Sequence, residues 1–349
     1  MKRQKKTTLV IGVFLFIAFC FFTIGSSVSM AEPIELKVTS FNPPHIPPMK
    51  LIQEWARVVE ERSGGQVKFT FYFAGSLVKM EDTFRAIQTG LADMGFWMIG
   101  NVKGLTPLNE YISLPFLGFK DLPTLYKVFK DMQSTTPELQ AEFKGLKLIY
   151  AYTMPPHQIH TVNKPVRVPD DIRGMKIMAD ANITDFVAAT GAIAVTKGPA
   201  DWYMSIQKGL VEGHIVHFNV VKFFKLEELL NYHTYLGETG IRSAVIGWWM
   251  NNDSFEKLPS DVQRIIMDLQ SKFEQRAFKD NMADLNMSME SSRKAGHPII
   301  ELKPQELKQW MRLGEGVQQQ WAEEMESKGK PGKKILTKAK QMITEYNQE

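Results

Sequence analysis

Apolar and polar residues alternate along the first part of the chain in a way that separates strands from helices. Residues 67–73 place Val67, Phe69 and Phe71 between polar neighbours, a period of two that predicts a strand with one buried face. The run after Pro47 instead repeats its apolar residues every three to four positions, which predicts an amphipathic helix. We also expect strands over 34–40 and 92–98 and a short helix over 82–90. This order predicts a parallel sheet with helices on both faces.

The alternation of strands and helices continues beyond residue 120. Residues 122–143 have a helical pattern that Pro137 is expected to break, and residues 146–152 predict a strand that crosses between two parts of the molecule. The run that begins at Ser260 contains neither proline nor glycine until Gly296, so it predicts a helix to about residue 294, which exceeds the usual length. The other expected elements are a strand over 243–250 and an amphipathic helix over 305–328.

Residues 163–213 predict a strand–helix unit that suits a binding site. A proline-rich approach leads to a short apolar strand over 175–179. A second apolar run over 193–195 precedes a helix that Pro199 opens and Gly209 closes. Ligands of open α/β sheets bind beyond the ends of the strands, so this unit predicts a ligand-sized gap there.

Two sets of spaced residues in this stretch carry a family resemblance. They resemble the Lys-Pro, P-x-D-L-[KR]-G-[LM]-K-I-R and E-x-Y-x-x-[LI]-Q-x-G-x-V-[DE]-G patterns of the substrate-binding proteins of TRAP transporters, the dicarboxylate-type periplasmic receptors. The I-Q-T-G-L-A-D-M-G run at 87–95 is also similar, and the resemblance covers most of residues 34–265. The matching residues are Lys164, Pro165, Pro169, Asp171, Ile172, Arg173, Gly174, Met175, Lys176 and Ile177, then Asp201, Tyr203, Ile206, Gln207, Gly209, Val211, Glu212 and Gly213.

The resemblance implies an α/β fold of the two-lobe periplasmic binding protein type. Mostly parallel sheets flanked by helices would form each lobe, and the lobes would be discontinuous because the chain crosses between them more than once. A long helix would brace both lobes, and the run from Ser260 is the candidate for it. We expect the first lobe to comprise residues 32–152 with 241–282, and the second to comprise 153–240 with 283–349. The helix over 305–328 is expected to pack on the second lobe.

The first 31 residues predict a signal peptide. Basic residues within 2–6 precede an apolar run over 9–24 and a small-x-small cleavage site that ends at Ala31. A retained membrane anchor is the alternative, although the apolar run is somewhat short for one. Cleavage would remove the only cysteine, Cys20, and four of the 42 basic residues, which leaves 38 basic against 38 acidic residues. We therefore expect a periplasmic chain without disulfides and without the positive field of a nucleic-acid-binding protein.

Patterns for catalysis and metal binding are weak. The sequence contains no G-x-S-x-G, no H-E-x-x-H and no glycine-rich phosphate loop. Two histidine pairs, His157 with His160 and His214 with His217, have a spacing that suits zinc only on a helix, and both lie in segments that we predict as loop or strand. We expect no enzyme activity, no metal and no cofactor. One histidine of each pair is expected to face the cleft as a hydrogen-bond donor.

One departure from the family pattern bears on the ligand. Where the family has an arginine after K-I that pairs with a ligand carboxylate, this chain has Met178. A second family arginine is replaced around Met154, and a polar position is replaced by Ile215 and Val216. We therefore expect a less acidic, more apolar or aromatic ligand, or another cation in place of the missing arginine. The candidate cations are His157, His160, Arg173, Lys197 and Arg242.

These arguments predict an extracytoplasmic receptor that captures a small organic ligand by hinge closure and delivers it to TRAP membrane permease subunits. Mobility is expected near 150–156 and 238–243. A receptor for an ABC importer or a sensor kinase, and an exported enzyme on the same scaffold, are the alternatives. A homodimer is left open, and no nucleic-acid partner is expected. The expected substrate-binding residues are His45, Trp97, Tyr152, His157, His160, Met178, His214, His217 and Trp248.

Overall fold

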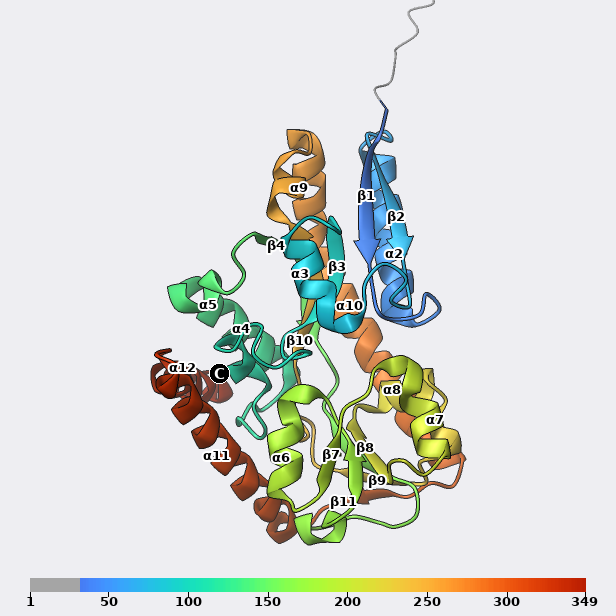
Figure 1. Cartoon of the computed structure of the whole chain (residues 1–349), viewed down its shortest axis with the longest axis vertical. Coiled ribbons are helices and arrows are strands. Elements are labelled where there is room, and N and C mark those ends of the chain that lie inside the picture. Colours follow the sequence, from blue (N-terminus) through green and yellow to red (C-terminus); the bar gives the residue numbers. More distant parts are fainter. Residues whose placement is uncertain (1–31) are drawn as a thin grey trace, which may run out of the picture. The chain divides into compact units, whose positions relative to one another are not determined.

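Two sheets divide the chain into two lobes in the computed structural model, which describes residues 32–349 (Figure 1). The signal peptide expected over 1–31 lies outside the described residues. The first lobe is built on the sheet with strand order β2-β1-β3-β10-β4, and the second on the sheet with order β11-β9-β5-β8-β6-β7. Both belong to one compact unit, Ile34–Glu349. The two-lobe α/β fold expected from the sequence is confirmed.

The first sheet is parallel on one side and antiparallel on the other. Strand β1 pairs in parallel with β2 and β3, whereas β10 runs antiparallel to both β3 and β4. The late strand β10 thus returns to a sheet begun by the N-terminal strands, which makes the first lobe discontinuous. Its strands are β1 (Ile34–Thr39), β2 (Val67–Tyr72), β3 (Met94–Met98), β4 (Leu146–Thr153) and β10 (Val245–Asn251).

The helices of the first lobe that the sequence predicts, after Pro47, over 82–90 and from residue 122, begin within one residue of the expected positions, whereas the short helix at Asn252–Glu256 was not predicted. Pro137 separates two helices as expected, and the side chain of Asp121 caps the first of them by accepting a hydrogen bond from the Thr124 N–H at 2.8 Å. The helices are α2 (Pro47–Arg62), α3 (Thr83–Gln88), α4 (Leu122–Thr135), α5 (Pro137–Ala141) and α9 (Asn252–Glu256), with 3-10 turns η1 (Met80–Asp82) and η2 (Asn109–Ser113).

The second sheet mixes both directions in the same way. Strand β6 pairs in parallel with β7 and β8, while β5 lies antiparallel between β8 and β9. Its strands are β5 (Gln158–Thr161), β6 (Lys176–Met178), β7 (Ile193–Val195), β8 (Gly213–Val216), β9 (Tyr232–Tyr235) and β11 (Ile299–Glu301). The short elements around it are α6 (Thr184–Ala189), α7 (Trp202–Gln207), α8 (Phe218–Phe223), η3 (Pro169–Ile172), η4 (Ala181–Ile183), η5 (Pro199–Asp201) and η6 (Leu226–Glu228).

Two connections between the lobes run side by side. One leads from β4 to β5 and the other from β9 to β10, and backbone hydrogen bonds join them. The Met154 N–H donates to the Ala244 carbonyl at 2.9 Å, and the His157 N–H donates to the Arg242 carbonyl at 2.8 Å. Gly240 lies so close that an added Cβ would sit 2.4 Å from the His157 carbonyl oxygen. The lobes are therefore linked by a paired ribbon that includes the segments where hinge mobility is expected.

The long helix α10 (Ser260–Lys294) has the limits predicted from the sequence. It packs against α2 and β4 of the first lobe and against α8 of the second, so it braces both lobes (Figure 1). Its buried stripe is apolar along the first lobe, as at Ile266 and Phe273, and contains polar Asn281 and Ser288 further on. Where the stripe becomes polar, Asn219 of α8 donates a hydrogen bond to the Asn281 side chain at 2.9 Å.

The C-terminal helices require one correction. Helix α11 (Pro304–Ser327) packs Trp310 into the core of the second lobe, as expected, but its later turns place Trp321 in a core of the first lobe. Helix α12 (Gly332–Gln348), which the sequence analysis did not identify, packs Ile335 and Ile343 into that same first-lobe core and contacts α4. The assignment of all of 283–349 to the second lobe was therefore wrong for α12. Apolar periodicity identifies a buried face but not the partner that covers it.

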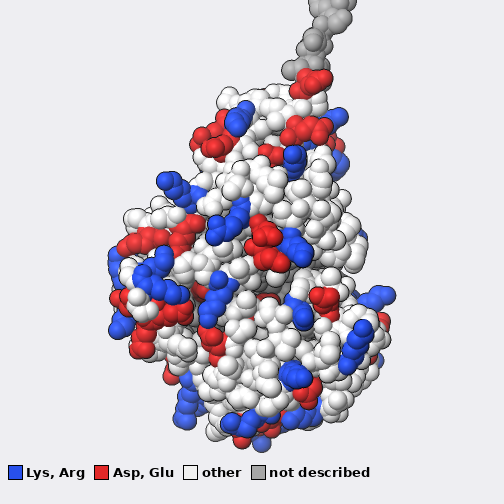
Figure 2. All heavy atoms as spheres, in the orientation of Figure 1, with Lys and Arg blue, Asp and Glu red and all other residues white. Residues whose placement is uncertain are grey.

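Charges are interspersed over the face of the molecule shown in Figure 2, without a field of one sign. Within residues 32–349, none of the helices is both long enough and apolar enough to cross a membrane. That same part of the chain contains no group of three or more His, Cys, Asp or Glu side chains placed to hold a metal ion.

Candidate functional site

A cavity lies between the two lobes, with about 720 Å³ of space unfilled by atoms when its open mouth is included. Strand ends and the loops after them line it from both sheets, which is where the sequence predicted a ligand gap. The lining residues are Phe41, Asn42, Ile46, Pro48, Met80, Phe96, Met98, Asn101, Tyr152 and Ile246 of the first lobe, Met154, Pro155 and His157 of the first connection, Asp180, Pro199, Trp202, Val216, His217, Val220, Phe223 and Phe224 of the second lobe, and Asn281 of α10.

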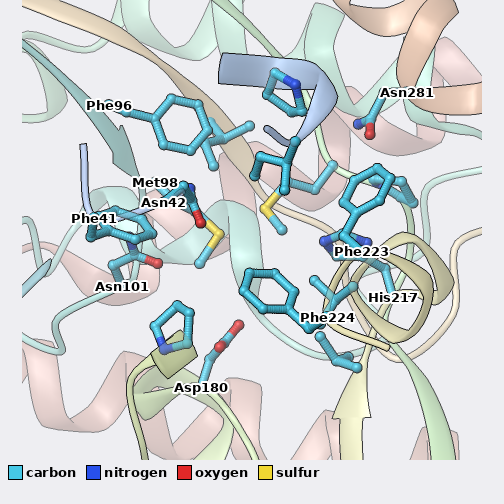
Figure 3. Close-up of a pocket in the computed structure, with 18 of the residues that line it drawn as sticks. Phe41, Asn42, Phe96, Met98, Asn101, Asp180, His217, Phe223, Phe224 and Asn281 are labelled. Atoms are coloured by element: carbon cyan, nitrogen blue, oxygen red, sulfur yellow. The ribbon is translucent and has the colours of Figure 1, made fainter. Parts of the chain in front are cut away.

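Aromatic and aliphatic side chains make up most of the cavity wall. Figure 3 shows Phe41 and Phe96 on one side of the space and Phe223 and Phe224 on the other. The rings of Phe41 and Phe96 lie 5.9 Å apart, and the Phe224 ring lies 4.9 Å from that of Trp202. Such walls favour a ligand with an apolar or aromatic body, because apolar contact and ring stacking supply most of the binding free energy there.

One cluster of ionisable side chains lies at the edge of this apolar space. Asp180 follows β6, and its Oδ2 contacts Nη2 of Arg242 and lies 3.1 Å from Nε2 of His157. The Arg242 side chain is 0% exposed, whereas 22% of the Asp180 side chain is exposed. Arg242 belongs to the second connection and His157 to the first, so the cluster joins β6 to both connections. The cluster is thus built from three separate segments of the chain.

The pKa shifts of this cluster keep Asp180 ionised and the histidines neutral. Burial alone would raise the pKa of Asp180, but the hydrogen bond from His157 and the charge of Arg242 outweigh it, so the pKa lies below its ordinary value. Burial, reinforced by the charge of Arg242, lowers the pKa of His157. Burial also lowers the pKa of His217, and the neighbouring His157 lowers it further. A neutral His157 must carry its proton on Nε2 to donate to the carboxylate, which leaves Nδ1 as an acceptor.

Of the nine expected substrate-binding residues, Tyr152, His157 and His217 line the cavity. Their rings come from β4, the first connection and the segment after β8, and the rings of the two histidines lie 5.7 Å apart. His45 does not line it, because its side chain points to solvent although the neighbouring Ile46 faces the cavity. For these four residues the sequence identified the right region, but only the fold decided which side chains reach the space.

The two expected tryptophans belong to the core of the first lobe instead. Trp97 lies on the opposite face of β3 from Phe96 and packs 4.8 Å from the ring of Phe84. Trp248 packs 5.0 Å from Phe96 and stands behind the cavity wall. Trp97 is absent from the cavity lining because successive side chains of a strand point to opposite faces and Phe96 takes the cleft-facing position. Trp248 shares the face of Phe96, its register partner on β3, but is fully buried in the core cluster there.

Three further expected residues lie inside the second lobe. Met178 is buried among Ile206, Val211 and other residues behind the cavity wall, so it does not face the ligand space. His160 is buried, with its Nδ1 2.7 Å from Nδ1 of His233. His214 is also buried, and its ring packs 5.2 Å from that of Trp202. Met178 was proposed from the matching motif and the two histidines from their pairwise spacing, and both signals identify a segment but not the direction of each side chain.

The sequence analysis missed the carboxylate and several aromatic residues of the cavity. Asp180 directly follows the predicted strand 175–179, and a polar residue at a strand end was the signal that could have identified it. Phe223 and Phe224 carry no comparable signal, because adjacent phenylalanines are ordinary core residues. Among the candidate cations, His157 lines the cavity as a neutral ring and Arg242 lies beside it behind Asp180, whereas Arg173 is exposed and paired with Asp170.

Comparison with known proteins supplies a family and related structures. A family model of the bacterial extracellular solute-binding proteins, family 7, matches residues 39–327. A solute-binding protein of Albidiferax ferrireducens is 25% identical over 280 residues, which are 76% of this chain and 78% of that protein. Other curated relatives are matched over 60% to 64% of their own length.

Two crystal structures show how closely the fold is shared. A TRAP periplasmic solute-binding protein from Desulfovibrio salexigens is 25% identical, with a TM-score of 0.75 over 90% of this chain and 97% of that chain. A TRAP solute-binding protein from a marine metagenome, specific for aromatic acid ligands and solved with metahydroxyphenylacetate, is 24% identical, with a TM-score of 0.83 over 90% of this chain and 99% of that chain. The second likeness establishes the fold alone.

Proposed function

We propose, on the premise that this chain belongs to the bacterial extracellular solute-binding proteins of family 7, that it is a periplasmic receptor for a TRAP-type transporter. As a solute-binding receptor it takes a small organic ligand into the cleft between its lobes. In the proposal, an N-terminal signal peptide directs export, closure of the lobes traps the ligand, and the loaded receptor delivers it to separate membrane permease subunits. The paired ribbon between the lobes would bend during closure.

The proposed ligand has an apolar or aromatic body and is less acidic than the carboxylates that the family usually takes. The observation that carries this proposal is the cavity wall, in which aromatic and aliphatic side chains together predominate and no lysine or arginine of residues 32–349 takes part. The marine metagenome relative, whose fold is similar, takes aromatic acids, which supports the aromatic body.

Identification of the bound molecule tests this function directly. The mature chain, residues 32–349, is purified from its natural host or from a host grown on aromatic compounds, and small molecules released by denaturation are identified by mass spectrometry. We expect a small aromatic or largely apolar compound. A compound that binds only the folded chain should also raise the melting temperature and reduce the radius of gyration in solution scattering. Recovery of a C4-dicarboxylate bound tightly in the cleft would contradict the proposed ligand class.

A further inference from the structure

Asp180 presents the one carboxylate that lines the cavity, and no lysine or arginine among residues 32–349 lines it. In Figure 3 the Asp180 side chain points into the space between the phenylalanine rings. The other polar groups of the wall belong to two neutral histidines, to the carboxamides of Asn42, Asn101 and Asn281, to the Tyr152 hydroxyl and to the Trp202 indole, whose N–H donates to the Lys197 carbonyl. The cavity therefore shows a ligand one fixed negative group and several neutral ones.

Arg242 lies beside the cavity, but its guanidinium is already paired with the carboxylate of Asp180. Its Nη2 contacts Oδ2 of Asp180, and its side chain is fully buried behind that carboxylate. Within residues 32–349, its Nε and Nη1 have no hydrogen-bond partner. The guanidinium thus depends on Asp180 for its counter-charge, and a buried guanidinium without one is strongly unfavourable. A ligand anion could reach Arg242 only by displacing Asp180.

From these contacts we infer that Asp180 determines ligand specificity: it takes the place of a ligand carboxylate on Arg242, so that the cleft selects an uncharged ligand that donates a hydrogen bond. This inference rests on the proposed receptor function and names the ligand class more closely. The ligand would carry a hydroxyl or amide N–H on its apolar or aromatic body.

The chemistry of the Asp180 carboxylate explains the selection. Oδ2 already accepts from His157 and Arg242, whereas no hydrogen bond within residues 32–349 uses Oδ1. A ligand hydroxyl can donate a hydrogen bond to this second oxygen without bringing another charge into the cavity. A ligand carboxylate would instead meet a carboxylate in a largely apolar space, where like charges repel strongly and the neutral histidines cannot compensate. A ligand ammonium would lie close to the guanidinium of Arg242, which offsets its attraction to Asp180.

Three probes of the same size separate these classes. Benzyl alcohol is an uncharged donor, benzoate is an anion and benzylamine is a cation at neutral pH. Their dissociation constants are measured calorimetrically for the parent protein, for Asp180→Asn and for Asp180→Ala. Asp180→Asn keeps the shape of the side chain and removes the charge, whereas Asp180→Ala opens a space in front of Arg242. Asp170→Asn removes an exposed carboxylate of the same lobe and serves as the matched control.

We expect the parent protein and Asp170→Asn to bind benzyl alcohol about tenfold or more tightly than benzoate or benzylamine. Both Asp180 variants should reverse the order of alcohol and acid, with a gain of about tenfold or more for benzoate, because Arg242 then needs an external anion. Formate should raise the melting temperature of Asp180→Ala and leave that of the parent unchanged, because it restores the missing carboxylate.

Several outcomes would overturn the inference while leaving the receptor function intact. One is a parent protein that binds benzoate or benzylamine as tightly as benzyl alcohol. Another is a pair of Asp180 variants whose preference equals that of the parent, with no stabilisation of Asp180→Ala by formate. The receptor function fails separately, if denaturation of the protein purified from its natural host releases no small organic molecule.

Discussion

Lys103 and Asp185 join the two lobes through an ion pair, with Nζ of Lys103 2.6 Å from Oδ2 of Asp185. Lys103 lies in the loop that follows β3 of the first lobe, and Asp185 lies in α6 of the second. Asn101, two residues before Lys103, lines the cavity, so the pair closes the cleft beside the ligand space. Both side chains remain partly exposed, at 41% and 38%.

Removal of this ion pair should slightly widen the range of distances between the two lobes. We expect Lys103→Gln and Asp185→Asn each to cost about 1 kcal/mol or less, because partly exposed ion pairs contribute little and are screened by salt. The mature chain is expected to lack cysteine, so spin labels at Lys68→Cys and Lys208→Cys can report the distance between the lobes. The label distances should broaden at low salt and converge with those of the parent at 1 M salt. Arg276→Gln, which breaks a pair within α10, is the control, and an equal broadening there would contradict the prediction.

Gly100 should tolerate no side chain in this arrangement of the lobes. Its φ is +86°, and an added Cβ would lie 2.2 Å from Nδ2 of Asn182 in the second lobe. Gly104 has nearly the same φ, +87°, with nothing within 4 Å of an added Cβ. Gly104→Ala therefore measures the backbone strain alone, which we expect to be about 1 kcal/mol. Gly100→Ala should lose more unfolding free energy than this and should hold the spin labels further apart. Equal effects of the two variants in both measurements would show that the contact with Asn182 does not matter.

Met178→Arg should affect folding rather than ligand choice. The Met178 side chain is buried behind the cavity wall, so an arginine there would place an unpaired charge in an apolar cluster. We expect a loss of about 3–5 kcal/mol in unfolding free energy, measured by urea denaturation. Met178→Leu keeps the volume and should cost less than about 1.5 kcal/mol. A stable Met178→Arg protein that binds small dicarboxylates would show that this position faces the ligand after all.

Two buried histidines should make the fold sensitive to acid. Burial lowers the pKa of His214 and of His233 to about 3, whereas an unfolded histidine titrates near 6.5. Between these values the unfolded chain binds the additional protons, so stability falls as the pH drops from about 6.5 toward 3. Each histidine contributes a slope of about 1.4 kcal/mol per pH unit.

This pH dependence is tested by comparing variants, because another group acts in the opposite direction. Burial raises the pKa of Glu110 to about 7, so its contribution to stability falls as the pH rises from about 4.5 to 7. His233→Gln and His214→Gln should each reduce the slope of unfolding free energy against pH between 6 and 4, relative to the parent. His45→Gln, at an exposed position, should leave the slope unchanged. A slope equal to that of the parent in both buried-site variants would contradict the prediction.

Much of the fold follows from local patterns in the sequence. Helix α10 begins and ends where the run without proline or glycine does, and the break between α4 and α5 coincides with Pro137. The alternation over 67–73 predicted β2 to within one residue. These features are local, because hydrogen bonds within a helix and the two faces of a strand depend on near neighbours and on backbone breakers.

The tertiary structure alone decided which residues form the site. Asp180 and Arg242 are 62 positions apart, and nothing in either local sequence marks them as partners. Periodicity shows that neighbours on β3 face opposite sides, but not that Phe96 faces the cleft and Trp97 the core. Periodicity likewise places Met178 on a strand, but it does not show that this side chain faces a buried cluster and not the cleft. Side-chain direction depends on how sheets and helices pack together, and shifting a strand by one residue would exchange its two faces.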